Sequence, residues 1–363
     1  MRILWLNHRD PLHPESGGAE VRIQQIGKRL VKKGFTIELI CEKWRGGPKS
    51  DYIDGIKVKR IGGRFGVHLG ALLSLRLKRN YDIVIDDIAH AVPWSSPLFT
   101  KKPVICQIHH LHQGILKFEL SPFWASIICL TERFVPLIYK RIIAVSESTK
   151  YSLNEQFNIP FRRIVVISNG VDSNSSGFVE KTNNPTILWI GRIKSYKRVR
   201  DLLLAFKLVK TKVSNAELLI VGDGDYVHQL KEESRIIGLR NVVFTGRVKE
   251  KEKIRLMKSS WIIVSTSMVE GWGMTIMEAA ACGTPAVGYN VAGLRDSIIH
   301  GKTGILVENG NISELAKALI LLLENDQLRI NLGKNALNRA KEFSWDKTAE
   351  QFMNVIEWVI NER

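Results

Sequence analysis

The sequence lacks three things, and each shortage excludes a class of protein. Its four cysteines are scattered among apolar residues without C-x-x-C spacing, which excludes a disulfide framework and a zinc ribbon. No apolar run is long enough to span a bilayer, and no repeat or low-complexity tract is present. The N-terminus has a short apolar stretch without a small-residue cleavage site, which predicts a first strand rather than a signal peptide, and a cytosolic protein. We expect buried thiols at Cys41, Cys106, Cys129 and Cys282.

What is present is a chain of 363 residues, of which 45% are hydrophobic and 25% charged. This length predicts about two folded domains of roughly 150 residues each. The formal net charge is +17, and basic residues are in excess in both halves of the chain. Such a surface suits nucleic acid, an anionic membrane or a phosphorylated substrate, and charge alone does not distinguish these partners.

Short aliphatic runs alternate with segments of helical periodicity along the chain. This alternation, with helices such as 19–33 and 199–210, predicts parallel sheets of βαβ units, and so an α/β fold with two doubly wound domains. Residues 173–185, rich in Ser, Asn and Gly, predict the interdomain linker. Residues 343–362 predict an amphipathic helix that returns to the first domain. Strands are expected at 3–6, 36–41, 83–85, 104–108, 142–145, 164–167, 187–190, 218–221, 242–244, 262–264 and 286–287.

Two adjacent glycines follow the first predicted strand and open a helix. The amides of Gly17 and Gly18, together with the positive end of the helix, could approach an anion. An ordinary strand-to-helix turn capped by Ser16 explains the same residues, and this plainer alternative is favoured when the segment is viewed alone.

A basic turn, Gly191-Arg192-x-x-x-x-Lys197, follows the strand expected at 187–190. The guanidinium fork of Arg192 and the point charge of Lys197 could together neutralise a diphosphate. A solvated basic loop explains the turn equally well.

The most specific pattern in the chain is EGWGMTIMEA at 270–279. A strand leads into a glycine-flanked turn, and a helix that begins near Gly273 would aim free amides at a ligand. Glu270 lies before this helix and Glu278 on its second turn, so the two cannot form an i,i+4 surface pair. Two carboxylates so placed suit a sugar and a ribose on either side of a bound diphosphate. The plainer alternative is a helix-start carboxylate and an exposed one.

Histidines in the pattern H-H-x-H follow the strand at 104–108. Imidazole groups in a cleft can relay protons or donate hydrogen bonds near neutral pH. Metal binding is disfavoured, because the spacing is not that of a metal site and no cluster of further ligands completes it. His110 and His112 fit structural roles, so His109 is the candidate and no metal is predicted.

Seven motifs, in order and spacing, resemble the large retaining glycosyltransferase family 4. The resemblance covers nearly the whole chain, and its most specific element is the E-x₇-E segment at 270–278. It implies a GT-B fold, in which two Rossmann-like domains face a central cleft: an acceptor-binding domain at 1–172, with the helix 345–363 packing back on it, and a nucleotide-sugar-binding domain at 185–344. The motifs are GGAE at 17–20, His109, NGVD at 169–172, GR-x₄-K at 191–197, VGDG at 221–224, EGWGMTIMEAAACGTP at 270–285 and GKTGILV at 301–307.

The resemblance also implies roles for single residues. Arg192 and Lys197 would bind the donor diphosphate and stabilise it as the leaving group. Glu278 would hold the ribose, Glu270 the transferred sugar, and His109 the sugar or its glycosidic oxygen. The reaction would be a retaining, front-face transfer of a hexose from a nucleotide-diphosphate sugar to a glycan or lipid-linked saccharide, with no metal or other cofactor. The donor-binding set is completed by Gly17, Gly18, Gly191, Gly222, Gly271, Gly273, Met274 and Thr275.

Two positions depart from the family pattern. The usual G-G-x-x-E after the E-x₇-E helix stands here as A-G-L-R-D at 292–296, which gives Asp296 a shorter reach to a sugar. The residue after His109, often Asp in relatives, is His110, which suits an anionic acceptor.

Residues 115–141 combine aromatic and aliphatic side chains with several Lys and Arg. The mixture suits docking on an anionic membrane and, equally, an interior helix with charged ends. Docking would indicate a polyprenyl-linked saccharide as acceptor and an enzyme at the inner membrane face.

Three other functions compete with glycosyl transfer. A noncatalytic nucleotide-sugar- or glycan-binding protein on the same scaffold is disfavoured, because all the candidate catalytic residues are present. A nucleotide-sugar epimerase would act without an acceptor. A nucleic-acid-binding protein would require clustered basic residues with exposed aromatics or a recognisable motif, and the sequence has neither.

Overall fold

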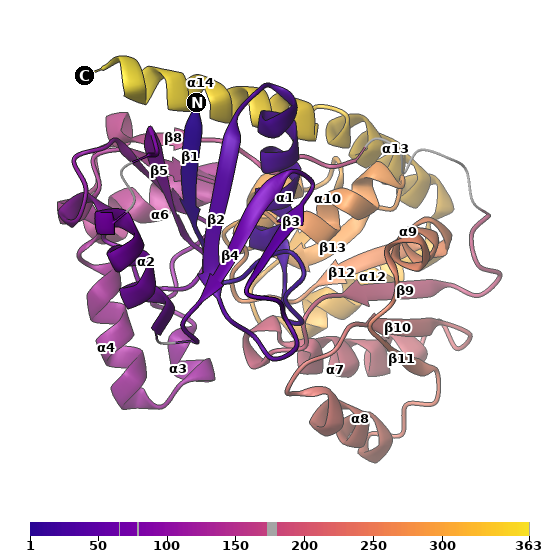
Figure 1. The fold of residues 1–363 in the computed structure, drawn as a ribbon. Helices are drawn as coiled ribbons and strands as arrows, with labels where there is room; N and C mark the ends of the chain where they lie inside the picture. Colours follow the sequence, from indigo (N-terminus) through magenta and orange to yellow (C-terminus); the bar gives the residue numbers. More distant parts are fainter. Residues whose placement is uncertain (65, 78–79, 173–179, 363) are drawn as a thin grey trace. The chain divides into compact units, whose positions relative to one another are not determined.

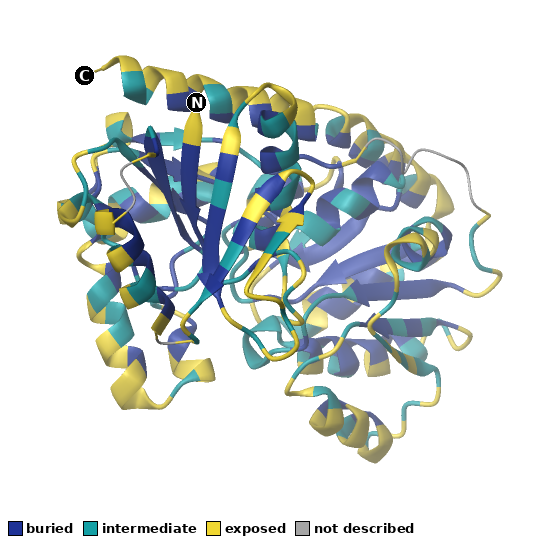
Figure 2. Ribbon diagram, viewed as in Figure 1, coloured by how far each residue is buried: buried dark blue, intermediate teal, exposed yellow. Residues whose placement is uncertain are grey.

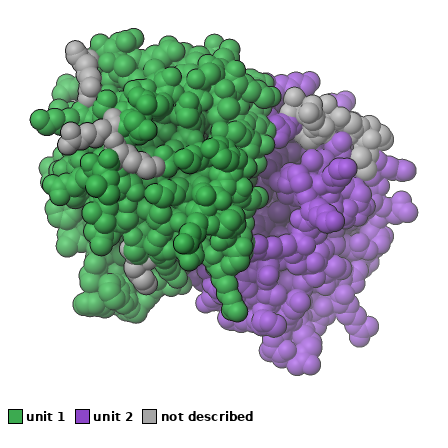
Figure 3. Space-filling model, viewed as in Figure 1, with its two compact units in different colours: residues 1–170, 345–363 green, residues 171–344 purple. Residues whose placement is uncertain are grey.

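The computed structural model describes residues 1–64, 66–77, 80–172 and 180–362, and it divides into two compact units (Figures 1 and 3). Unit 1 comprises Met1–Gly170 and Trp345–Arg363, and unit 2 comprises Val171–Ser344. The linker predicted at 173–185 lies partly outside the described residues. Both ends of the chain belong to unit 1 (Figure 1).

Unit 1 is built on an eight-stranded sheet in the order β3-β4-β2-β1-β5-β6-β7-β8. All neighbouring strands run parallel except β3 and β4, which are antiparallel. The strand order reverses between β1 and β5, and ligands of open α/β sheets bind at such a point. The strands are β1 (Arg2–Leu6), β2 (Thr36–Glu42), β3 (Ser50–Ile53), β4 (Ile56–Ile61), β5 (Ile83–Ile88), β6 (Val104–Ile108), β7 (Ile142–Ala144) and β8 (Ile164–Val166).

Helices cover both faces of this sheet. Because successive side chains of a strand point to opposite faces, alternate residues of β1 lie in two different cores. Ile3 and Trp5 join a core with α1 and α14, whereas Leu4 and Leu6 join a core with α2, α5 and α6. The central strands β1, β2, β5, β6 and β7 are accordingly buried along most of their length, whereas the edge strand β3 is largely exposed (Figure 2). The helices are α1 (Gly18–Lys32), α2 (Gly66–Leu77), α3 (Leu116–Glu119), α4 (Pro122–Glu132), α5 (Val135–Ile138), α6 (Glu147–Phe157) and α14 (Trp345–Asn361).

The last helix, α14, packs against α1, although it is far from α1 in the sequence (Figure 1). The ring of Phe352 stacks on Trp5, with 5.2 Å between the ring centroids and an interplanar angle of 4°. An ion pair of 2.6 Å between Arg29 and Asp346 adds to this contact. The C-terminal helix therefore supplies one wall of the unit 1 core.

Unit 2 has a six-stranded parallel sheet in the order β11-β10-β9-β12-β13-β14, and its order reverses between β9 and β12. One apolar core joins the sheet to its helices. The strands are β9 (Thr186–Ile190), β10 (Glu217–Val221), β11 (Val242–Gly246), β12 (Ile262–Ser265), β13 (Ala286–Tyr289) and β14 (Gly304–Val307). The helices are α7 (Val199–Lys210), α8 (Val227–Ile236), α9 (Glu250–Ser259), α10 (Met274–Ala281), α11 (Leu294–Ser297), α12 (Ile312–Glu324) and α13 (Asp326–Ala340).

The predicted α/β class is confirmed, and all eleven predicted strands are present, with ends that differ by a few residues. Sequence analysis missed β3, β4 and β14, and β3 breaks the predicted parallel pattern. The prediction of four buried thiols is wrong for Cys129 and Cys282, which are partly exposed, whereas Cys41 and Cys106 are buried.

Candidate functional site

The carboxyl ends of β9 and β12 are neighbours in the unit 2 sheet, because β9 pairs with β12 where the strand order reverses. From β9 the chain continues into Gly191, Arg192 and a 3₁₀ turn at Ser195–Lys197. From β12 it continues into the loop that carries Glu270, directly before α10. Two motifs far apart in the sequence therefore meet at one edge of the sheet.

Lys197 and Glu270 form an ion pair at this edge. Lys197 Nζ lies 2.6 Å from Glu270 Oε1, and the hydroxyl of Ser267 donates to the same oxygen at 2.6 Å. Burial opposes the charge of Lys197, but the negative charge of Glu270 and its hydrogen bond outweigh burial and raise the pKa of the ammonium group. The structure thus brings together a firmly charged cation and a carboxylate that the sequence predicted for one site.

The start of α10 lies beside this pair. Gly273 is its N-cap with φ 73°, and a Cβ atom there would lie 2.8 Å from Ser297 Oγ, so the position favours glycine. The helix ladder begins with Ile276 N and Met277 N, which both donate to Gly273 O. The amides of Met274 and Thr275 precede the ladder, and such amides at a helix start can bind an anion.

Glu278, on the second turn of α10, is held by Lys253 of α9. Lys253 Nζ lies 3.1 Å from both carboxylate oxygens of Glu278 and 2.9 Å from Glu250 Oε1. Burial raises the pKa of Glu278, and Lys253 opposes this shift. Sequence analysis missed Lys253, because its i,i+3 spacing from Glu250 is that of an ordinary helix-surface pair.

Glycines bring the ends of β9 and β10 unusually close. Gly222 has φ 133°, and a Cβ atom there would lie 1.9 Å from Gly191 O, so no other residue fits without a shift of the backbone. Gly191 N also donates to Val221 O at 3.0 Å. Close packing of these two segments therefore explains why glycine stands at positions 191 and 222. Gly271 is half-buried in the loop before α10.

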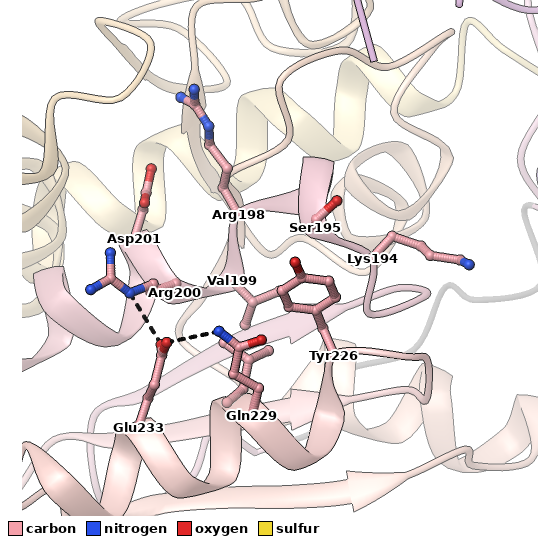
Figure 4. A pocket seen from close by; sticks show the side chains of 10 residues that line it. Lys194, Ser195, Arg198, Val199, Arg200, Asp201, Tyr226, Gln229 and Glu233 are labelled. Carbon is pink, nitrogen blue, oxygen red and sulfur yellow. Dashed lines mark hydrogen bonds and ion pairs between the residues drawn. The ribbon is translucent and has the colours of Figure 1, made fainter. Parts of the chain in front are cut away.

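A cavity of about 380 Å³ opens beside the basic turn, between the starts of α7 and α8 (Figure 4). Several of its charged side chains pair with one another. Glu233 accepts from Arg200 Nε and Gln229 Nε2, each at 3.2 Å, and Lys194, whose side chain lines the cavity, contacts Asp225. The cavity was not predicted. Lys194 and Ser195 stand at the unspecified positions of the GR-x₄-K motif, and most of the other lining residues belong to α7 and α8, which carry no motif.

The glycine turn of unit 1 stands at the start of α1. Gly17, not Ser16, is the N-cap, and its amide donates to Glu20 Oε2 at 2.6 Å. Glu20 Oε1 in turn accepts from Asn7 Nδ2 at 3.2 Å. Glu20, the acid of the GGAE motif, therefore accepts the hydrogen bond that the Gly17 amide donates. Gly18 is the first residue of the helix and is exposed.

His109 follows β6, and its ring Nε2 lies 2.7 Å from Oδ1 of Asp87 on β5. The His109 side chain is only 10% exposed and that of Asp87 is fully buried. His112 has a structural partner, because Glu132 Oε1 accepts from its amide at 2.9 Å and lies 3.3 Å from its ring Nδ1. Sequence analysis missed Asp87, since its place within the aliphatic strand β5 gives no sign of a functional role.

Among the described residues, no three His, Cys, Asp or Glu side chains are grouped so as to hold a metal ion. Asp296, the shortened acid of the family pattern, accepts from the amide of Gly293 at 3.2 Å and caps α11.

The segment of α3, α4 and α5 has an exposed apolar surface rather than an interior position. Of the α4 residues, only Ala125 and Glu132 are buried, so the alternative of an interior helix is wrong. In the part of the chain that the structure describes, no helix combines the length and apolar character needed to cross a membrane. We name the exposed set the aromatic surface; it consists of Phe118, Phe123, Trp124, Ile127, Leu130, Phe134 and Leu137.

Two family models match the chain in succession. The model described as Glycosyltransferase Family 4 matches residues 16–175, and the model described as Glycosyl transferases group 1 matches residues 172–339. An uncharacterized glycosyltransferase of Methanocaldococcus jannaschii is 27% identical, over 93% of this chain and 94% of its own. The N-acetyl-alpha-D-glucosaminyl L-malate synthase of Bacillus anthracis is 32% identical, over 47% of this chain and 44% of its own.

Solved structures share the fold over the full chain. Sucrose-phosphate synthase from Thermosynechococcus elongatus has a TM-score of 0.82 at 19% identity and covers 100% of both chains. The Anabaena protein HepE, solved in complex with UDP-glucose, has a TM-score of 0.76 at 20% identity, over 98% of this chain and 99% of its own. The two parallel-sheet units thus have the GT-B fold that the motifs implied.

Proposed function

The chain belongs to the group 1 glycosyltransferases, and on that premise we propose that it transfers a hexose from a nucleotide-diphosphate sugar to a saccharide acceptor with retention of anomeric configuration. The observation that carries the proposal is the pair of Lys197 and Glu270, a cation and a carboxylate 2.6 Å apart. The ammonium group of Lys197 suits the negative charge of a diphosphate, and the carboxylate of Glu270 can accept a hydrogen bond from a sugar hydroxyl. The UDP-glucose bound by the fold neighbour HepE supports a hexose donor.

Departure of the diphosphate is the step that needs charge stabilisation. As the bond from the anomeric carbon to the diphosphate oxygen breaks, its electron pair passes to the diphosphate, and Arg192 and Lys197 stabilise the charge. The amides of Met274 and Thr275 add the positive end of α10. In this proposal these groups supply the positive charge, and no metal ion or other cofactor takes part.

The acceptor hydroxyl attacks the anomeric carbon on the face from which the diphosphate leaves. Its oxygen forms the new glycosidic bond, and its proton passes to the departing diphosphate oxygen. Configuration is retained because attack and departure occur on the same face. Glu270 holds hydroxyls of the transferred sugar, and Glu278, kept in place by Lys253, holds the ribose. His109 contacts the sugar or its glycosidic oxygen.

The aromatic surface supports a lipid-linked saccharide as the acceptor. Its exposed side chains include Phe123 at 68%, Trp124 at 55% and Leu137 at 80%. The same segment exposes three basic residues, Lys117, Arg133 and Lys140. Within residues 115–141, all of which the structure describes, Glu119 is the only exposed acidic residue. Aromatic side chains flanked by basic ones favour the interface of an anionic membrane. We therefore propose peripheral contact with the inner face of such a membrane.

Calorimetric titration of the metal-free protein with UDP, GDP and ADP, and then with their sugar conjugates, tests the donor site. We expect a clear preference for one nucleotide. The preferred conjugate is then incubated with lipid-linked saccharides, and NMR of the product gives the anomeric configuration. Binding to none of the nucleotides by a folded protein contradicts the proposed donor site, and an inverted product contradicts retention. A donor that binds and is never consumed supports the noncatalytic alternative.

A further inference from the structure

A chain of buried polar groups leads to His109, and it begins at Arg22 of α1. The Arg22 side chain is fully buried, which lowers its pKa to about 10, so the guanidinium is still charged at neutral pH. Its Nε donates to Gln107 Oε1 at 2.9 Å, and its Nη1 donates to Asn169 Oδ1 at 2.6 Å. Because arginine has only donors, these two contacts have a fixed direction.

The side-chain amide of Gln107 fixes which group donates in the next hydrogen bond. Since Gln107 must offer its oxygen to Arg22, its Nε2 is a donor, and it lies 2.6 Å from Asp87 Oδ2. The indole Nε1 of Trp5, also donor-only, lies 3.2 Å from the same oxygen. Two donors of fixed direction thus occupy Oδ2 and leave Oδ1 of Asp87 to His109.

The contact between Asp87 Oδ1 and His109 Nε2, at 2.7 Å, then determines the position of the ring hydrogen. A carboxylate only accepts, so Nε2 carries the hydrogen, and in a neutral imidazole Nδ1 is then an acceptor. Gln107 Nε2 is also 3.5 Å from His109 Nε2, but both atoms are donors in this arrangement. Within the described residues, the ring has no further hydrogen bond, which leaves the Nδ1 edge for a ligand.

We propose that Asp87 is a positioning residue that fixes neutral His109 as the Nε2–H tautomer, so that the ring offers Nδ1 as a hydrogen-bond acceptor to a saccharide hydroxyl. A hydroxyl is the fitting partner because it can donate to this atom, whereas a phosphate oxygen cannot. The tautomer follows from the contacts alone, and only the identity of the hydroxyl-bearing ligand rests on the proposed function.

Nitrogen NMR of the histidine-labelled full chain, in buffer alkaline enough to keep imidazoles neutral, tests the tautomer without any substrate. The His109 signals are assigned by their loss in His109→Gln. We expect a protonated Nε2 and an unprotonated Nδ1 in the wild type. In Asp87→Asn, Trp5 and Gln107 still require an acceptor oxygen, which turns the new amide NH₂ toward His109, and the tautomer switches to Nδ1–H.

The neighbouring residue Asp86 provides the matched control. It is equally buried on β5, but it accepts from Ser96 and Tyr139 and not from His109. Asp86→Asn is therefore expected to leave the His109 tautomer unchanged. A wild-type His109 with its hydrogen on Nδ1 overturns the proposal outright, even if Asp87→Asn fails to fold. An unchanged tautomer in a folded Asp87→Asn also overturns it.

Transfer activity measures whether Asp87 acts through His109. We expect Asp87→Asn to lower kcat/KM about tenfold, the usual effect of one lost hydrogen bond, and to cause no further loss in the His109→Gln background. Additive losses would contradict the positioning role. A protein without any transfer activity contradicts the proposed function instead, and the NMR result still decides the tautomer.

Discussion

Lys197 and Glu270 neutralise each other across 2.6 Å at the carboxyl edge of the unit 2 sheet, although both belong to the site proposed for a charged ligand. A diphosphate that binds Lys197 must compete with Glu270 for it. In the proposed reaction, the ammonium group would turn to the phosphate and the Glu270 carboxylate would be released toward the hydroxyls of the sugar. Binding of the diphosphate half of the donor would then prepare the site for its sugar half.

The change Glu270→Gln separates these two roles. We expect it to tighten the binding of the preferred nucleoside diphosphate about fivefold, because Lys197 loses its competing counter-charge, and to lower transfer strongly, because the sugar loses a charged acceptor. Calorimetry and the transfer assay give the two values. Glu217→Gln serves as the control. Glu217 lies at the amino end of β10, at the edge of the sheet opposite Glu270, and its change should alter neither diphosphate binding nor transfer. Weaker diphosphate binding in Glu270→Gln would contradict the competition.

Glu278→Ala is expected to weaken nucleotide binding about tenfold, since a hydrogen bond from a ribose hydroxyl to a charged group is lost. Lys253→Met should give a smaller loss in the same direction, because Glu278 loses the partner that holds both of its oxygens. Lys251→Met, an exposed residue of the same helix, is the control. Wild-type nucleotide affinity in Glu278→Ala would show that the ribose is held elsewhere.

Arg192→Ala is expected to reduce transfer by about a hundredfold or more, because a preorganised charge on the leaving group is removed. The fold should survive, as judged by circular dichroism and by the unfolding temperature. Arg200→Ala, which changes an exposed arginine of the nearby cavity, should keep wild-type turnover. Normal turnover in Arg192→Ala would exclude this residue from the site.

The double change Phe123→Ser and Trp124→Ser should reduce binding to vesicles of anionic phosphatidylglycerol at least about tenfold, since two exposed aromatic side chains no longer enter the interface. Co-sedimentation measures the bound fraction. Ile236→Ser removes an apolar side chain of α8 that is 72% exposed and should have no effect. Equal binding of the wild type to phosphatidylcholine, or no binding to either lipid, would contradict an anionic membrane as the partner.

Burial raises the pKa of Asp86 to about 6, against the hydrogen bonds of Ser96 and Tyr139. A raised pKa in the folded state means stability that is fully present below the unfolded value of 3.8 and is lost as pH rises through about 6. Asp86→Asn removes this dependence. The free energy of unfolding of the variant, minus that of the wild type, should therefore rise by about 2 kcal/mol from pH 4 to pH 6. Urea titrations across this range provide the test, and a constant difference would contradict it.

Local sequence patterns were enough to predict much of the fold. Alternation of strand and helix patterns predicted α7 with its observed bounds, because its apolar residues repeat at helical spacing and stay buried. The antiparallel pair β3 and β4 was missed, although its turn carries a strong signal. Asp54 and Gly55, with φ 50° and 82°, form the kind of Asp-Gly turn that joins hairpin strands.

The candidate site was predictable only where a motif marks it. Glu270, Lys197 and Glu278 lie in motifs, and the structure shows that Lys197 meets Glu270. Lys253, the partner of Glu278, and Asp87, the partner of His109, could not be found, because each looks ordinary in its own segment. Lys253 is one member of a helix-surface pair, and Asp87 is part of an aliphatic strand. Their importance arises from packing between elements that are distant in the sequence.

The stacking of Phe352 on Trp5 has a consequence for how the chain is made. The first strand leaves the ribosome early, but α14, which packs on one face of its sheet, emerges only after the whole of unit 2. Unit 1 therefore cannot complete its core until the whole of unit 2 has been synthesised. Unit 2 is contiguous in the sequence, so it can complete its own core first.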